Sequence, residues 1–324
     1  MPVIVRDLNI SIKNINDVLR CLSLASMLEV AGWPKPGNVH RTKNFNKTKF
    51  EHFLAGIAAI QPSFEKFCKR ISQYSFIENS DYESIELGQF FKEAVEEMMK
   101  WQRGGNVLLG HILILAPLVA AVVICLNKNQ LGFGDFKFFL NKLIAGATVK
   151  DTINLYEAIR LCNPGGLGKI DKYDINDDIS FDQIKNEKIT LKRIFELSRQ
   201  YDLISLEYST GFQIILSEGL PFFIETFNKY CDINIATVNS YLYILSRHPD
   251  TLIIRKSGLD SALYVSDSAM NILRYKGIAS KKGLKFTFDL DKKLQENKGR
   301  MNPGTTADLI AGVIFCSLIF GLRF

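Results

Sequence analysis

The residues best able to do chemistry lie where predicted loops meet predicted helices. The first such junction reads AGWPKPGNVHRTKNF, residues 31–45, in which two prolines stiffen the chain and a glycine lets the backbone turn closely. Its polar side chains could contact a phosphate or a base, or they could be solvated charges on a rigid loop between helices. These side chains belong to Lys35, Asn38, His40 and Arg41.

The second junction, Gly104-Gly105-Asn106, opens a long apolar run. Unpaired backbone N–H groups at a helix start bind anions readily, and Asn106 could either cap the helix or face a ligand. His111 follows about one turn later, where a histidine is more typical of a core side chain with a hydrogen-bond partner than of a catalytic base.

The third junction, NPGGLGKIDKYDINDD, places three glycines just before a lysine. Gly165, Gly166 and Gly168 would let the backbone approach a phosphate beside Lys169. The stretch is not a P-loop, because that motif needs an earlier glycine and a Ser or Thr directly after the lysine. The carboxylates that follow could hold Mg²⁺ through oxygen ligands or could form a solvated acidic loop. They belong to Asp171, Asp174, Asp177 and Asp178.

The fourth junction, NPGTTADLIAGVIF, combines hydroxyls with a lone carboxylate. Thr305 and Asp308 have the spacing of a capping box, while the hydroxyls of Thr305 and Thr306 at a helix start would also suit a phosphate. Asp308 stands in an otherwise apolar helix, where an unpaired buried charge would be costly. We therefore expect its side chain to face a ligand, a metal or a basic partner.

Helical periodicity dominates the chain between these junctions and predicts an all-α fold. The segments expected to be helical are residues 16–31, 49–61, 63–74, 83–101, 135–147, 149–162, 190–203, 219–230, 233–246 and 258–275. Strand signals are confined to Pro2–Val5 and Lys285–Leu290. We expect residues 1–324 to form a single large domain around buried apolar central helices, with a flexible charged segment near residues 276–300.

The run from Val107 to Leu126 raises the question of a membrane span, because it holds no charged side chain and would cover about 30 Å as a helix. A helix that is apolar on every side also suits the centre of a large helical domain. The second apolar run, Leu309–Leu322, is short for a span. We expect a core helix and no membrane partner.

The overall composition favours a protein that acts on small molecules. A net charge of +6 suits polyanionic ligands but is too diffuse to indicate nucleic-acid binding. The six cysteines are scattered without zinc-ligand spacing, which is typical of a reducing compartment. The first residues lack the apolar stretch of a signal peptide. We expect a cytoplasmic protein without nucleic-acid partners, and the apolar surface leaves a homodimer open.

Six segments taken together resemble the triphosphoribosyl-dephospho-CoA synthase family over roughly residues 16–322. They are PKPGNVH (34–40), GGNVLLG (104–110), AIRLCNPGGLGK (158–169), YDLISLEYSTGF (201–212), DTLIIRKSG (250–258) and NPGTTADL (302–309). The resemblance implies an all-α enzyme that moves the triphosphoribosyl group of ATP to the 2′-hydroxyl of 3′-dephospho-CoA and releases adenine. It also implies ATP and Mg²⁺ as the nucleotide and its cation.

This reaction suggests roles for the residues of the six segments. Cleavage of the ribose–adenine bond needs a nearby carboxylate, a proton donor for adenine and a base for the attacking hydroxyl. The residues that we expect to be catalytic are Asp308, Asp202, Glu207 and His40. The residues that we expect to hold nucleotide or phosphates are Lys35, Asn38, Asn106, Gly165, Gly166, Gly168, Lys169, Asp250, Arg255, Lys256, Thr305 and Thr306. Those expected to hold Mg²⁺ are Asp174 and Asp308.

One departure from the family pattern affects the second segment. Better-known members read N-T-H-K-G there, whereas this chain reads Asn106-Val107-Leu108-Leu109-Gly110, so three polar groups have become apolar. Either the same reaction proceeds with altered contacts, or the acceptor or the reaction has changed. The alternatives are a nucleotide-dependent kinase or nucleoside hydrolase and a non-catalytic nucleotide-binding helical protein.

Overall fold

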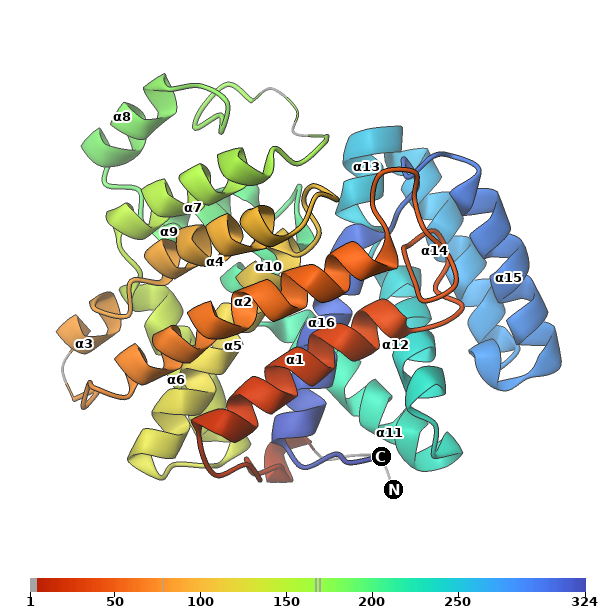
Figure 1. Cartoon of the computed structure of the whole chain (residues 1–324), viewed down its shortest axis with the longest axis horizontal. Helices are drawn as coiled ribbons and strands as arrows, with labels where there is room; N and C mark the ends of the chain where they lie inside the picture. The colour runs from red at the N-terminus through yellow and green to blue at the C-terminus, as the bar shows by residue number, and fades with distance from the viewer. Residues whose placement is uncertain (1–4, 78, 167, 169) are drawn as a thin grey trace.

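Two apolar helices, α5 and α16, lie at the centre of the fold and explain where the core sits. In the computed structural model, which describes residues 5–77, 79–166, 168 and 170–324, α5 spans Leu109–Lys128 and α16 spans Gly304–Ile319. Both are apolar on every side, and the two helices pack against each other (Figure 1). Gly312 permits this contact, because a Cβ there would come within 2.7 Å of the Ile114 side chain. The all-α prediction is confirmed.

Further helices cover these central helices on both sides (Figure 1). α1 packs against α16 and α2, α2 against α4, and α4 against α7. The helices of this half are α1 (Ile15–Ala31), α2 (Phe50–Ile71), α3 (Asn79–Glu83), α4 (Leu87–Trp101), α6 (Phe133–Gly146), α7 (Val149–Cys162), α8 (Ile179–Asn186), α9 (Leu191–Ser198) and α10 (Leu203–Thr210).

The second half continues from a short π-helical segment, Ile214–Gly219, into α11. α12 packs against α16, and α14 packs against α12, α13 and α15. The helices of this half are α11 (Leu220–Tyr230), α12 (Ile233–Arg247), α13 (Thr251–Ser257), α14 (Leu259–Arg274) and α15 (Lys281–Gln295). The short helix α13 brings its residues beside the first turn of α16, which matters for the site.

Residues 276–300, expected to be a flexible charged segment, instead contain α15, and the strand predicted for Lys285–Leu290 is wrong. Gly283, Thr287, Leu290 and Leu294 recur at helical spacing and are buried, so the charged residues occupy the other face. The other predicted strand, Pro2–Val5, lies almost entirely outside the described residues, and Val5 begins a short 3-10 helix.

The second and third predicted helices differ from the structure, whereas the predicted core helix is present. The helices predicted on either side of Pro62 form one helix, α2. The apolar face of α2 packs against α4, where the rings of Phe64 and Phe67 both contact the Phe90 ring. The run at Val107–Leu126 forms the predicted core helix. α5 is the one described helix long and apolar enough to cross a membrane, and 89% of its most apolar window is buried by other parts of the chain.

Candidate active site

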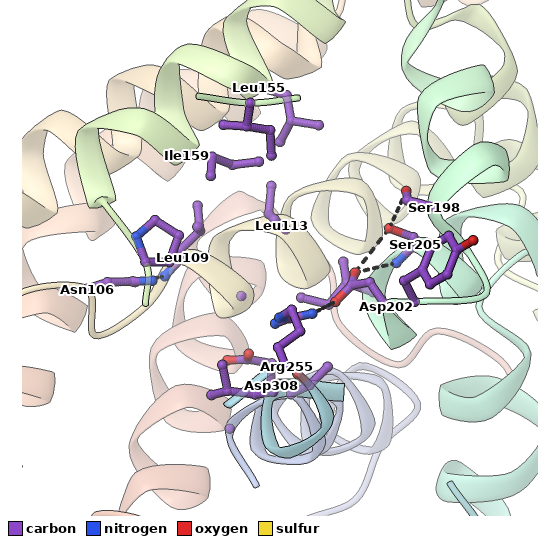
Figure 2. Close-up of a pocket in the computed structure, with 18 of the residues that line it drawn as sticks. Asn106, Leu109, Leu113, Leu155, Ile159, Ser198, Asp202, Ser205, Arg255 and Asp308 are labelled. Carbon is purple, nitrogen blue, oxygen red and sulfur yellow. Dashed lines mark hydrogen bonds and ion pairs between the residues drawn. The ribbon is translucent and has the colours of Figure 1, made fainter. Parts of the chain in front are cut away.

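A cavity of about 760 Å³ opens between the two halves of the fold, and each of the six sequence segments contributes residues to its walls (Figure 2). Its walls come from α1, α5, α7, α9, α10, α13, α16 and the loop that follows α7. The volume falls in the range of small-molecule and cofactor sites. The charged groups on its walls determine which chemistry it could support.

A buried ion pair at the end of α1 brings one of its members, Glu29, to the cavity wall. Glu29 and Lys35 are both almost fully buried, and the Lys35 ammonium group contacts the Glu29 carboxylate and donates to the Glu29 backbone carbonyl at 2.8 Å. Glu29 also lies 3.2 Å from Nε2 of His111. Burial on its own would raise the pKa of Glu29, but Lys35 and His111 outweigh it and hold this pKa below its ordinary value.

Asp308 lies beside this pair and faces the cavity. Its Oδ1 is 3.8 Å from Nε2 of His111, and its carboxylate sits against Gly110, where a Cβ would come within 1.9 Å of Oδ2. Burial raises the pKa of Asp308 well above its ordinary value, and the charges of Glu29 and Asp250 raise it further. Both effects favour the neutral carboxylic acid over the carboxylate at this position.

A second carboxylate, Asp202, lies at another wall of the cavity (Figure 2). Asp202 caps α10, because its Oδ2 accepts hydrogen bonds from the backbone N–H and the hydroxyl of Ser205 at 2.9 and 3.0 Å. Its Oδ1 pairs with Arg255 of α13 at 3.0 Å. The N-cap geometry and the ion pair fix this carboxylate in one position, while part of its side chain stays accessible.

Several other predicted residues also line the cavity. Asn106 lines the cavity, and its Oδ1 accepts a hydrogen bond from the backbone N–H of Leu109 at 3.1 Å at the start of α5. Asp174 accepts backbone N–H groups of Ile170 and Asn176 at 3.0 and 2.8 Å, and thus shapes the loop after α7. The remaining predicted residues on the walls are Asn38, Gly165, Gly168, Arg255 and Thr305.

Other predicted residues are placed in the surrounding framework, off the cavity walls. His40 is buried and pairs with Asp291 of α15 at 3.3 Å, and the same carboxylate accepts from Gly37 N–H at 2.9 Å. Asp250 caps α13 and also accepts from the backbone N–H and the hydroxyl of Thr306, at 2.7 and 2.8 Å. The capping-box interpretation of residues 305–308 is wrong, because the N-cap of α16 is Pro303, not Thr305, and the side chain of Pro303 makes no capping hydrogen bond.

The glycine loop contacts the end of α13. Gly166 has a left-handed backbone with φ of 85°, and a Cβ there would lie 3.1 Å from the Lys256 side chain. Lys35, Gly166 and Lys256 are off the walls, and Lys169 lies outside the described residues. The loop and the lysine of α13 thus meet at the rim of the cavity.

Comparisons with known proteins agree with this arrangement. The family model for ATP:dephospho-CoA triphosphoribosyl transferase (CitG) matches residues 15–323. The chain belongs to this family. The probable 2-(5″-triphosphoribosyl)-3′-dephosphocoenzyme-A synthase of Streptococcus mutans is 24% identical, over 93% of this chain and 96% of its own.

Two further relatives describe the extent of the similarity. A Salmonella gallinarum synthase of the same name is 27% identical over 111 residues, 34% of this chain and 36% of its own length. A crystal structure from Archaeoglobus fulgidus, assigned as a triphosphoribosyl-dephospho-CoA synthase, superposes with a TM-score of 0.62. It is 27% identical and covers 83% of this chain and 100% of its own. Most of this triphosphoribosyl transferase family member thus shares the fold of that protein.

Glu29 is the cavity residue that the sequence analysis missed. It stands at helical spacing from Ala25 on the buried face of α1, where a lone carboxylate must find a cation. This need for a basic partner could have identified Glu29 from the sequence. Its partners in the structure are Lys35 and His111. At the departure from the family pattern, Val107 and Leu109 contribute apolar wall to the cavity of this family member.

The expected Mg²⁺ ligands do not form a protein-built metal site. Among the described residues no group of three or more His, Cys, Asp or Glu side chains is placed to hold a metal ion. Burial raises the pKa of Asp308 and so disfavours the charged form that a cation needs, and Asp174 already accepts two backbone N–H groups. The donor set therefore does not fit a resident cation held by the protein alone.

Glu207 lies off the cavity walls and serves the framework instead. Its two oxygens accept the backbone N–H groups of Ile214 and Ile215 at 2.8 and 2.9 Å, at the start of the π-helical segment. Burial raises the pKa of this carboxyl to about 8, even though these two donors oppose the shift.

The raised pKa of Glu207 predicts a pH-dependent stability. The folded state keeps a proton that the unfolded state loses above about pH 4.5, so stability falls as pH rises towards 8, by roughly 3 to 5 kcal/mol at most. Glu207→Gln should remove this slope. Urea unfolding at pH 5 and pH 8 measures how the unfolding free energy changes with pH. The same change in the wild-type protein and in Glu207→Gln would contradict the assignment.

Proposed function

We propose that this protein transfers the triphosphoribosyl group of ATP to the 2′-hydroxyl of 3′-dephospho-CoA and releases adenine. The observation that carries the proposal is the position of Asp308, which faces a cavity of ligand size and lies 3.8 Å from Nε2 of His111, the imidazole that also contacts Glu29. Burial raises the pKa of this carboxyl group and so favours its acid form. Asp202 and Arg255 supply a second carboxylate and a cation on another wall. An acid and a base at separate places suit a displacement at the anomeric carbon.

In this mechanism the C1′–N9 bond of ATP breaks and its electron pair leaves with adenine. Asp308 donates its proton to a ring nitrogen, which makes adenine a better leaving group. The acceptor 2′-oxygen bonds to C1′ and gives its proton to Asp202, while solvent restores both carboxyl groups afterwards. The buried Glu29 carboxylate adds negative charge near the positive charge that develops on the ribose.

The triphosphate lies at the rim of the cavity, between the glycine loop and Lys256. Lys256 is half-buried, and its ammonium group has no hydrogen-bond or ion-pair partner among the described residues. Burial and the neighbouring Arg255 lower the pKa of Lys256, as expected for a cation without an acidic partner. A phosphate chain would supply that partner, and the nearby Gly165 and Gly166 leave room for it.

We expect Lys256→Met to raise the KM for ATP about tenfold or more, because one charge-assisted hydrogen bond to phosphate is lost. The unfolding free energy should not fall, since the wild-type protein buries an uncompensated cation there. Lys281→Met, which removes an exposed lysine of α15, is the matched control. Steady-state kinetics with varied ATP measures the effect, and an unchanged KM would remove Lys256 from the phosphate site.

Mg²⁺ would be part of the ATP substrate complex, in which phosphate oxygens would be its main ligands. Mg²⁺ commonly uses one or two carboxylates together with substrate phosphates, which agrees with the lack of a three-ligand cluster among the described residues. Bound there, it would neutralise phosphate charge. The protein acts in the cytoplasm on these small molecules, without nucleic-acid or membrane partners.

The direct test incubates the purified protein with ATP, Mg²⁺ and 3′-dephospho-CoA, and follows free adenine and product mass together. Adenine in step with an acceptor that has gained triphosphoribose supports the transferase. Intact ATP and unmodified acceptor, from a protein shown to be folded by circular dichroism, would overturn the proposal.

A further inference from the structure

The wall of the cavity that faces away from its charged groups is apolar. Leu109 and Leu113 are four residues apart on α5, and Leu155 and Ile159 are four residues apart on α7, so each pair shares one helix face. Figure 2 shows Leu155, Ile159 and Leu113 on the opposite side of the cavity from Asp308 and Arg255. The cavity therefore has a charged half and an apolar half.

The apolar half is built as a rigid surface. Phe195 of α9 extends it and stacks on the Tyr208 ring at a centroid distance of 4.0 Å. The Tyr208 hydroxyl donates to the backbone carbonyl of Leu113 at 2.6 Å, which ties α10 to α5. Leu155 and Phe195 are only 2% and 5% exposed. A preformed wall of this kind selects a ligand by shape and by lack of charge.

This half of the cavity cannot hold phosphates, because an aliphatic wall offers neither charge nor donors to replace their water. Adenine is also a poor match for the four aliphatic side chains, since its ring edges need hydrogen-bond partners. The acceptor of the proposed reaction has one long uncharged part, the pantetheine arm with its geminal methyl groups. The departure at Val107 and Leu109 adds to the same apolar wall.

We infer that the apolar half binds the pantetheine arm of the acceptor, an inference that rests on the proposed function. The arm lies along Leu109, Leu113, Leu155 and Ile159, while the acceptor ribose lies towards Asp202. Recognition of the arm makes the enzyme select a pantetheine-bearing nucleotide over a plain nucleotide with the same 2′-hydroxyl.

The test compares two acceptors at saturating ATP and Mg²⁺: 3′-dephospho-CoA and ADP, which keeps the ribose 2′-hydroxyl and the diphosphate but lacks the arm. We expect kcat/KM for 3′-dephospho-CoA, from the mass-resolved adduct, to exceed that for ADP by at least about a hundredfold. Equal values would overturn the inference and leave the proposed function intact. No adduct with either acceptor would overturn the proposed function, and the inference with it.

Two variants on one helix locate the effect. Ile159→Asn places an amide on the wall, whereas Leu161→Asn makes the same change at a 46% exposed position of α7 off the cavity walls. We expect Ile159→Asn to lower kcat/KM for 3′-dephospho-CoA about tenfold, with KM for ATP and use of ADP unchanged, and Leu161→Asn to have no effect. A rise in the KM for ATP instead would place adenine on this wall and overturn the inference. If Ile159→Asn does not fold, the wild-type acceptor comparison decides alone.

Discussion

The Asp308→Asn variant is expected to release adenine from ATP about a thousandfold more slowly than the wild-type protein. The amide has the shape of the carboxylic acid but cannot transfer an acidic proton, and general acid catalysis commonly contributes about a hundred- to ten-thousandfold. The wild-type rate should fall towards alkaline pH as the raised pKa of Asp308 is passed, and the variant should lack this limb. Initial rates of adenine release across a pH series measure both effects.

Binding and stability distinguish this role from a structural one. Because burial disfavours the charged form of Asp308, its replacement by a neutral isostere should leave the melting temperature unchanged or slightly higher. ATP affinity by calorimetry should change less than a few-fold, since the phosphate contacts lie at Lys256. A variant that keeps more than about a tenth of the wild-type rate would show that another group protonates adenine.

The second large effect is expected from Gly110→Ala, which leaves the chemical identity of Asp308 unchanged but displaces its side chain. A Cβ at Gly110 would come within 1.9 Å of Oδ2 and 2.1 Å of Cγ of Asp308, so the carboxyl group must move. The end of a short side chain can move at little cost in stability, but misplacing a reacting group by about 1 Å can cost about a hundredfold in rate. We expect a loss of this size with the fold intact.

The matched control is Gly134→Ala in α6, where a new Cβ would meet no atom within 4 Å. It should leave activity unchanged and slightly favour the helix. The double variant Gly110→Ala, Asp308→Asn should be no slower than Asp308→Asn alone, because both changes act through one group. Gly110→Ala activity within threefold of wild type, or an additive loss in the double variant, would contradict the positioning of Asp308 by Gly110.

The sequence by itself predicted the features that depend on local pattern. Apolar residues at helical spacing indicated most of the helices, and the charge-free run after Asn106 indicated a helix buried on all sides, as α5 is. The orientation of Asp308 also followed from local reasoning, because a carboxylate in an apolar helix is costly unless it faces a ligand, a metal or a basic partner. Its Oδ1 lies 3.8 Å from Nε2 of His111, which is such a partner, and the side chain faces the cavity.

Only the tertiary structure decided which charged side chains pair with one another. Lys35 suited a phosphate by sequence but lies with Glu29, and His40 lies with Asp291, 251 positions further along the chain. Glu207 suited catalysis and Asp250 suited nucleotide binding, but their carboxylates accept backbone N–H groups at the starts of helical segments. A side chain's type limits its possible partners, but its actual partner is set by how the helices pack, and that packing depends on contacts between distant residues that no local spacing encodes.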